Sequence, residues 1–246
     1  MRNQTNSMTC ISNERQLGVA LLQYCQENDQ AFPPGAHYSD GRGWAGEIYQ
    51  YVKSTAPYKC PGDNLTPSNV FYKGPYYVCS YAYNINLSSK LVKAGKAARE
   101  KTTINALPSP EKTVALSEIT GNVAKVDNNY GHFDEDSAAS FGAYRYDGFS
   151  PKGQLKGDTG YLGTPPAINP SWSLNPVGRH GGAANYLMAD GHVKYVLGAK
   201  VSPGASARYP TDRQGKDTAK YGDIKVPTAA GTGAAAPSFQ ATFSAI

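Results

Sequence analysis

One continuous helical stretch at the start of the chain constrains the fold more than any other feature. Residues 6 to 29 contain no proline, and their apolar side chains recur with the spacing of an amphipathic helix. These side chains form two adjoining stripes, Ile11, Gly18, Leu22 and Cys25 on one and Cys10, Leu17, Leu21 and Tyr24 on the other. Phe32-Pro33-Pro34 ends the pattern. At about 1.5 Å per residue, such a helix is roughly 35 Å long.

The width of this apolar face leaves two interpretations open. The helix could be wholly buried in its own domain. Alternatively, one stripe packs on a sheet and the other contacts a neighbouring subunit, since two stripes are more than one sheet contact requires. We adopt the second interpretation as the prediction, with a subunit interface formed by Ile11, Leu17, Leu21 and Leu22.

Composition indicates β structure and loops after the helix. The 246 residues, enough for one large or two small domains, include 26 glycines, 17 prolines and 18 tyrosines, and only 17% are charged. No run approaches the roughly 18 apolar residues of a membrane span. The net charge is +5, and basic residues cluster only in Lys90 to Lys101. That run lacks interleaved aromatic side chains, so no nucleic-acid partner is expected.

Four cysteines, Cys10, Cys25, Cys60 and Cys79, allow several pairings. Cys10 and Cys25 would lie about 22 Å apart on one helix, too far for a disulfide. Cys60 and Cys79 flank a segment rich in proline and glycine, and a possible disulfide between them would suit an oxidising compartment. Four free buried thiols remain the alternative. Neither a Cys-x-x-Cys nor a Cys/His pair with zinc-ligand spacing is present.

Periodicity predicts a short helix and several strands downstream of the first helix. The short helix spans 44 to 52, and the strands span 76–84, 112–118, 184–189 and 192–197. In the first strand Tyr77, Cys79, Tyr81 and Tyr83 share one side.

Asp190-Gly191 predicts a two-residue turn between the last two strands. In that register Tyr186 opposes Tyr195 and Met188 opposes Val193, which places these four residues on one apolar face. The other face, which should be wetter, carries Asn185, Leu187, His192 and Lys194.

Two regions show no helical or strand periodicity. Residues 119 to 177 are polar, rich in glycine and irregular, as functional or variable insertions are. Within them Asp134, Glu135 and Asp136 could ligate calcium through oxygens, although an EF-hand loop is absent and a solvated acidic loop is the simpler interpretation. Residues 199 to 246 form a low-complexity extension. There Phe239, Phe243 and Ile246 could either dock a terminal strand or belong to a loose tail.

No catalytic motif stands in the context it requires. A Gly-x-Ser-x-Gly elbow, a His-Glu-x-x-His motif, a P-loop and a dinucleotide fingerprint are all missing from the sequence. His180 is followed by Gly181 and Gly182, which allow the chain to fold back onto the sheet, so we predict a structural hydrogen bond for His180. A metal or catalytic role together with Asp190 is the alternative. We therefore expect no enzyme and no cofactor.

Five segments in sequence order carry a resemblance to a known family. They are Cys10 to Pro33, Tyr58 to Asp63, Ser80 to Asn84, Pro108 to Glu118 and Arg179 to Val193. The first resembles the helix that follows the membrane segment in bacterial type IV pilin-like and type II secretion pseudopilin-like proteins. The last is similar to the H-X9-DG signature of a large subfamily of them, here His180, Asp190 and Gly191.

The resemblance implies an α+β pilin-like fold, with a long N-terminal helix packed on an antiparallel sheet. It implies a structural subunit that is anchored in the inner membrane, cleaved by a prepilin peptidase, and assembled into a periplasmic or extracellular filament. Its partners would be other pilin or pseudopilin subunits and the assembly machinery. The family's cleavage site and apolar anchor are not found here, so this chain should be soluble. A glycan- or cation-binding module on the same fold is the alternative function.

Overall fold

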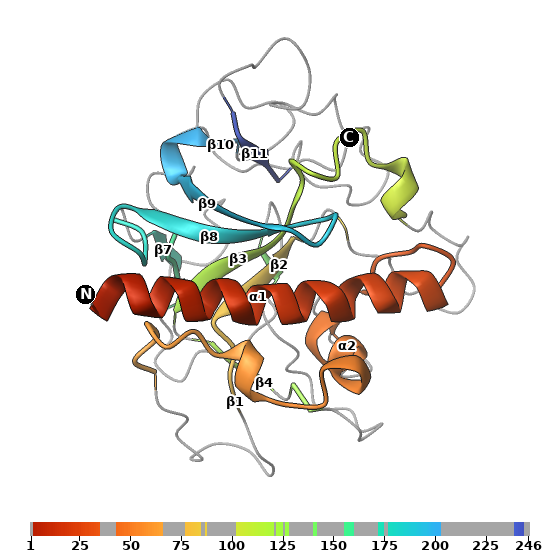
Figure 1. Cartoon of the computed structure of the whole chain (residues 1–246), viewed down its shortest axis with the longest axis horizontal. Coiled ribbons are helices and arrows are strands. Elements are labelled where there is room, and N and C mark those ends of the chain that lie inside the picture. Colours follow the sequence, from red (N-terminus) through yellow and green to blue (C-terminus); the bar gives the residue numbers. More distant parts are fainter. Residues whose placement is uncertain are drawn as a thin grey trace.

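The chain folds as an α+β protein in which one long N-terminal helix crosses an antiparallel sheet (Figure 1). The computed structural model describes residues 2–34, 43–65, 77–84, 87, 102–120, 122–124, 126–127, 140–141, 155–159, 172–174, 177–202 and 239–243. Among these residues, no helix has the length and apolar character needed to cross a membrane.

The first helix, α1, spans Arg2–Glu27 and confirms the helix predicted from the two stripes. A left-handed turn ends it: the N–H of Gln30 donates to the carbonyl of Cys25 at 2.8 Å, with φ of 57° at Asp29 and 63° at Gln30. The backbone therefore leaves the helix before the two prolines, which explains why α1 ends slightly earlier than predicted.

The remaining elements follow in a mixed order. They are α2 (Trp44–Val52), η1 (Ala56–Tyr58), β1 (Tyr77–Val78), β2 (Tyr81–Asn84), η3 (Ile104–Ala106), β3 (Val114–Thr120), β4 (Val123–Ala124), β5 (Ser140–Phe141), β6 (Leu155–Gly157), β7 (Trp172–Leu174), β8 (Ala183–Met188), β9 (Val193–Leu197), η4 (Gly198–Lys200), β10 (Val201–Ser202) and β11 (Ala241–Thr242). The short helix α2 has the predicted bounds. The four predicted strands correspond to β1 with β2, and to β3, β8 and β9.

Strand β3 lies at the centre of the main sheet. It pairs antiparallel with β2 on one side and with β8 on the other, and β9 continues the sheet antiparallel to β8. The end of β3 also pairs with β6, and β7 runs parallel to β6. Strands β4 to β7 all come from residues 119 to 177, which were predicted to be irregular, so that region contributes short strands to the sheets.

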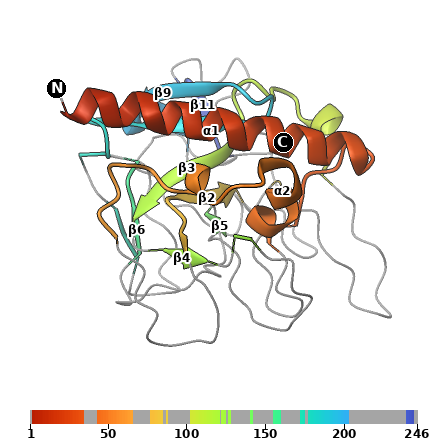
Figure 2. The ribbon, with the colours of Figure 1, turned by 60° about the horizontal axis from the view of Figure 1, so that its bottom comes forward.

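The side chains of the two apolar stripes of α1 are buried or half-buried by two parts of its own chain. In Figures 1 and 2 the helix runs between α2 on one side and the β8–β9 hairpin on the other. Leu17 and Leu21 are 0% and 1% exposed in the core shared with α2, whereas Ile11 and Leu22 are half-buried. The prediction that Leu17 and Leu21 form a subunit interface is therefore wrong, because the chain's own core covers them.

The β8–β9 hairpin has a longer turn than predicted. Leu187 opposes Val193 and Tyr186 opposes Lys194, so Ala189, Asp190 and Gly191 form a three-residue loop. The N–H of Gly191 donates to the carbonyl of Met188 at 3.0 Å, and Gly191 has a φ of 90°. A turn followed by a left-handed glycine is the standard three-residue connection, so Asp-Gly marked the hairpin but not its register.

Strand β8 is buried on both faces, which contradicts the prediction of one wet face. Asn185 and Leu187 lie toward α1 and are 0% exposed. Tyr186 and Met188 face a second apolar cluster that includes Phe243. This cluster exists because β11 pairs parallel with β10, so part of the C-terminal extension docks onto the sheet. Ile246 lies outside the described residues.

Helix α1 and the hairpin approach each other closely at two glycines. A Cβ on Gly18 would lie 2.7 Å from Cδ1 of Leu187 and 3.0 Å from the carbonyl oxygen of Gly191. A Cβ on Gly191 would lie 2.6 Å from Cδ1 of Leu22. The loop of the hairpin therefore rests directly on the middle of the helix.

Candidate functional site

A cluster of buried charged and polar side chains lies between α1 and the sheet. We call it the buried polar network, and its members are Cys10, Glu14, Cys60, Asp63, Ser80, Glu118, Thr120, Asp158, Arg179, His180 and Asn185. They come from α1, β3, β8 and the segments around residues 60–63, 80, 158 and 179–180, most of which are far apart in the sequence, so the network exists only in the folded chain.

Glu118 is the central acceptor of this network. It lies on β3, and its side chain is 0% exposed. Nε2 of His180 donates to its Oε1 at 2.8 Å, and the backbone N–H of Asn185 donates to its Oε2 at 2.9 Å. Both carboxylate oxygens therefore have donors, which compensates for the removal of this carboxylate from water.

Arg179 supplies the positive charge of the network. Its side chain, only 4% exposed, donates from Nη2 to Asp158 at 2.6 Å and to Oγ1 of Thr120 at 2.8 Å. Oδ2 of Asp63 lies 3.8 Å from Nη2, and Oε1 of Glu118 lies 4.0 Å from Nη1. Burial alone would lower the pKa of Arg179, but Glu118, Asp158 and Asp63 raise it, so the guanidinium stays charged.

His180 reaches the network because the chain turns sharply after it. Gly181 and Gly182 have φ of 68° and 98°, and the N–H of His180 donates to the carbonyl of Ala183 at 3.0 Å. The predicted structural hydrogen bond of His180 is confirmed, with Glu118 as its acceptor. The alternative pairing of His180 with Asp190 is wrong, because Asp190 lies at the other end of β8 and binds His192.

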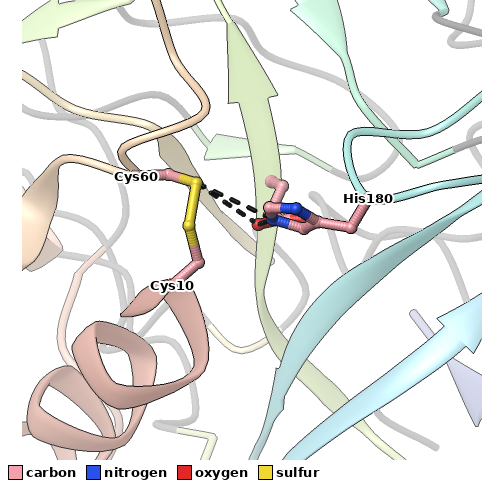
Figure 3. Close-up of side chains that lie close together, drawn as sticks. Cys10, Cys60 and His180 are labelled. Carbon is pink, nitrogen blue, oxygen red and sulfur yellow. Dashed lines mark hydrogen bonds and ion pairs between the residues drawn. A yellow bond between two sulfur atoms is a disulfide. The ribbon is translucent and has the colours of Figure 1, made fainter. Parts of the chain in front are cut away.

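A disulfide between Cys10 and Cys60 closes one side of the network (Figure 3). Their Cα atoms are 5.1 Å apart, within the normal range. The predicted Cys60–Cys79 disulfide is wrong, because Cys10 points inward from α1 toward the turn that holds Cys60. Cys79 instead donates its S–H to the carbonyl of Tyr81 at 3.4 Å. Cys25 and Cys79 are free and buried, and burial raises the pKa of each thiol to about 12.

Glu14 is a buried carboxyl group in the same region. It lies one turn after Cys10 on α1, and within the described residues neither of its carboxylate oxygens has a hydrogen-bond partner. Burial raises its pKa well above the ordinary value; the charge of Glu118 raises it further, while Arg179 lowers it. Glu14 therefore holds a proton in the folded chain at a pH where an exposed glutamate is ionised.

Replacing Glu14 with glutamine should stabilise the chain increasingly as the pH rises. A raised folded pKa means that the parent has its full stability below about pH 4.3, the unfolded value, and loses stability as the pH rises through the folded value. Glu14→Gln cannot ionise, so its advantage should reach on the order of 1 kcal/mol near pH 8. Urea unfolding of both chains at several pH values measures this difference.

The matched control is Glu111→Gln, an exposed glutamate in a turn before β3. That variant should follow the pH dependence of the parent within about 0.5 kcal/mol. If the stability difference between Glu14→Gln and the parent stayed constant with pH, the raised pKa of Glu14 would be contradicted.

The geometry of the network favours a structural role over a catalytic one. Its central groups, Glu118 and His180, are 0% and 4% exposed, and their strong donors and acceptors point at one another. Cys10, Cys60, Glu118 and His180 each offer one ligand atom, and these atoms lie within 4.8 Å of one another. The weak calcium candidates Asp134, Glu135 and Asp136 lie outside the described residues.

Sequence reasoning found His180 but missed most of its partners. Glu118 was visible only as the single acid at the end of an apolar strand, and Arg179 as the neighbour of His180. Asp63 follows Cys60 in a turn, where an acid is ordinary. Asp158 carried no signal, because it lies in the irregular region and meets Arg179 only through the pairing of β6 with β3.

Fold and site together define an α+β protein with a disulfide-closed buried polar network. Comparison of the chain with protein-family models, with characterised proteins and with solved structures gave no match.

Proposed function

We propose that this chain is a structural subunit of a pilus or pseudopilus of the type IV or type II secretion kind. The observation that carries the proposal is that all five segments resembling that family contribute to one place. Cys10 and Glu14 come from the first segment, Cys60 and Asp63 from the second, Ser80 from the third, Glu118 from the fourth, and Arg179, His180 and Asn185 from the fifth. Segments matched only by their order in the sequence would have no reason to meet in space.

The exposed face of α1 supports a role in assembly. Met8 and Val19 are 72% and 58% exposed and lie on the same side of the helix, about 16 Å apart along its axis. Single exposed apolar residues are ordinary on protein surfaces, but two on the helix that the family uses for filament contacts suit a subunit interface. In this proposal Met8 and Val19 take the place of Leu17 and Leu21 as contact residues.

The proposed partners are other subunits of the same filament and the machinery that assembles them. The Cys10–Cys60 disulfide supports a location in the periplasm or outside the cell, where such bonds persist. Attachment to the inner membrane before assembly would come from the apolar segment that this family carries ahead of its helix.

Val19→Glu should abolish filaments without unfolding the chain. The side chain is exposed, so the substitution should change folding stability by no more than about 0.5 kcal/mol, whereas a charge in a packed helix interface is desolvated without a partner. Filaments are counted by electron microscopy of the native cells after labelling with an antibody against the chain.

Val177→Glu is the matched control, because Val177 is 61% exposed but lies outside α1. It should leave filaments at the parental level. Filaments at the parental level in Val19→Glu would contradict the assembly face, and cells that make the parent chain but no labelled filament would contradict the proposed function itself.

A further inference from the structure

The disulfide and the two groups beside it form a set of ligands suited to zinc. Sγ of Cys60 lies 3.8 Å from Nε2 of His180 (Figure 3). The same sulfur lies 3.8 Å from Oε1 of Glu118. All four candidate ligand atoms of Cys10, Cys60, Glu118 and His180 are within 4.8 Å of one another and buried. A tetrahedral zinc with bonds of about 2.0–2.3 Å sets its ligand atoms about 3.3–3.8 Å apart.

We propose that reduction of the Cys10–Cys60 disulfide converts this corner of the network into a structural zinc site. Two thiolates, one imidazole nitrogen and one carboxylate oxygen then bind Zn²⁺, so the metal and the disulfide are alternative occupants of the same place. Reduction frees both sulfur atoms to separate to about 3.8 Å, the spacing of two thiolates on zinc.

Hydrogen bonds from neighbouring residues already orient the carboxylate of Glu118 and the backbone of His180. The backbone N–H of Asn185 donates to Oε2 of Glu118 at 2.9 Å, which leaves Oε1 toward Cys60 and His180. The backbone carbonyl of His180 accepts from the hydroxyl of Tyr195, and its N–H donates to Ala183. Outer partners of this kind fix the orientation of metal ligands and sustain affinity.

The charge of the site is balanced by Arg179. Two thiolates, a carboxylate and Zn²⁺ sum to one negative charge, and the guanidinium of Arg179 lies 4.0 Å from Oε1 of Glu118. Mixed sulfur, nitrogen and oxygen ligands with four-fold coordination select zinc over magnesium or calcium, which require oxygen ligands. With four protein ligands and no open position, the site would support the fold rather than catalyse a reaction.

The chemical step requires an external reductant. A phosphine takes an oxygen atom from water and becomes its oxide, and the disulfide gains two electrons and two protons to give two thiols. Zn²⁺ then binds both sulfur atoms as thiolates, and the two thiol protons leave to solvent. The imidazole of His180 changes tautomer, so that its proton moves from Nε2 to Nδ1, and the hydrogen bond between Nε2 and Oε1 of Glu118 gives way to bonds from both atoms to the metal.

Cobalt binding to the reduced chain tests this proposal, because Co²⁺ bound to thiolates has a charge-transfer band. The parent for the test is the Cys25→Ser, Cys79→Ser double variant, in which only Cys10 and Cys60 remain. After phosphine reduction it should bind one Co²⁺ per chain with that band, and Zn²⁺ should displace the cobalt. The oxidised chain should give no band, and Zn²⁺ should raise the melting temperature of the reduced chain only.

Two further substitutions assign the ligands. His180→Gln should weaken binding at least tenfold, whereas the same change at His192, at the far end of β8, should leave binding unchanged. Cys10→Ser should also weaken binding at least tenfold and reduce the band. A reduced parent with no thiolate-to-cobalt band overturns the proposal whether or not any variant folds. Equal weakening by His180→Gln and His192→Gln overturns it as well.

Discussion

Arg179→Met should destabilise the chain by about 3–5 kcal/mol, a large share of the stability of an ordinary domain. Methionine keeps an apolar stem of similar length but removes the cation that faces Asp63, Glu118 and Asp158. Those three buried carboxylates would then repel one another without compensation, and the carbonyl of Ile119 and Oγ1 of Thr120 would lose their donor. Urea unfolding followed by circular dichroism measures the loss.

Two comparisons separate the charge from the shape of this side chain. Arg179→Lys keeps the charge but not the planar fork of donors, so its loss should lie between those of the parent and Arg179→Met. Arg15→Met removes an exposed arginine of α1 and should change stability by no more than about 0.5 kcal/mol. If Arg179→Met were as stable as Arg15→Met, Arg179 would not be what holds the network together.

Removal of the Cys10–Cys60 disulfide should cost about 4 kcal/mol. The bond closes a loop with a sequence separation of 50, and the chain-entropy model assigns about this penalty to a loop of that length. The Cys10→Ala, Cys60→Ala double variant should therefore unfold at a lower urea concentration than the oxidised parent. A reductant should lower the midpoint of the parent and leave that of the double variant unchanged.

Substitution of the free cysteines provides the control for this experiment. Cys25→Ala and Cys79→Ala should keep the sensitivity of the parent to reductant, because neither thiol is in a disulfide. Loss of that sensitivity in Cys79→Ala would instead indicate the pairing of Cys60 with Cys79. Peptide mapping without reduction identifies the bonded pair directly.

Local signals predicted the elements of this fold well. The helix α2 was found at its observed bounds because Trp44 and Ile48 recur at helical spacing and Gly43 precedes them. The strands β3 and β8 were found because both are apolar runs that begin or end at a turn. Such patterns depend only on neighbours in sequence, so they can be recognised without any knowledge of the fold.

Contacts between distant segments were harder to predict. The positions of Cys60 and Cys79 at the two ends of one segment favour a disulfide between them, whereas the actual partner of Cys60 lies 50 residues earlier, in α1. The prediction of a subunit interface at Leu17 is wrong because helical periodicity identifies an apolar face but does not show which part of the protein packs against that face. Here α2 and the sheet both cover the helix. Predicting this coverage requires knowledge of how the elements pack in three dimensions.

The hairpin register shows a different limit. Asp190-Gly191 located the turn, but a two-residue and a three-residue loop share the same glycine, and choosing between them shifts every cross-strand pair. Neither helical or strand periodicity nor turn residues could predict the buried polar network, because its members meet only after β3, β8 and α1 have packed.

The nine residues between His180 and Asp190 fix the distance between the two places where the β8 region contacts α1 and its neighbours. At one end of β8, His180 binds Glu118 beside Cys10; at the other, Gly191 rests on Gly18 and Leu22. Strand β8 covers about 20 Å at about 3.3 Å per residue, and the helix from Cys10 to Leu22 covers about 18 Å. The spacing therefore matches a strand length to a helix length, so that α1 is seated on the sheet at both ends simultaneously. A residue added between the two ends would leave one of them without its partner. The spacing between His180 and Asp190 is therefore explained by the packing of α1 on the sheet, and not by a metal-binding or catalytic pairing of the two residues.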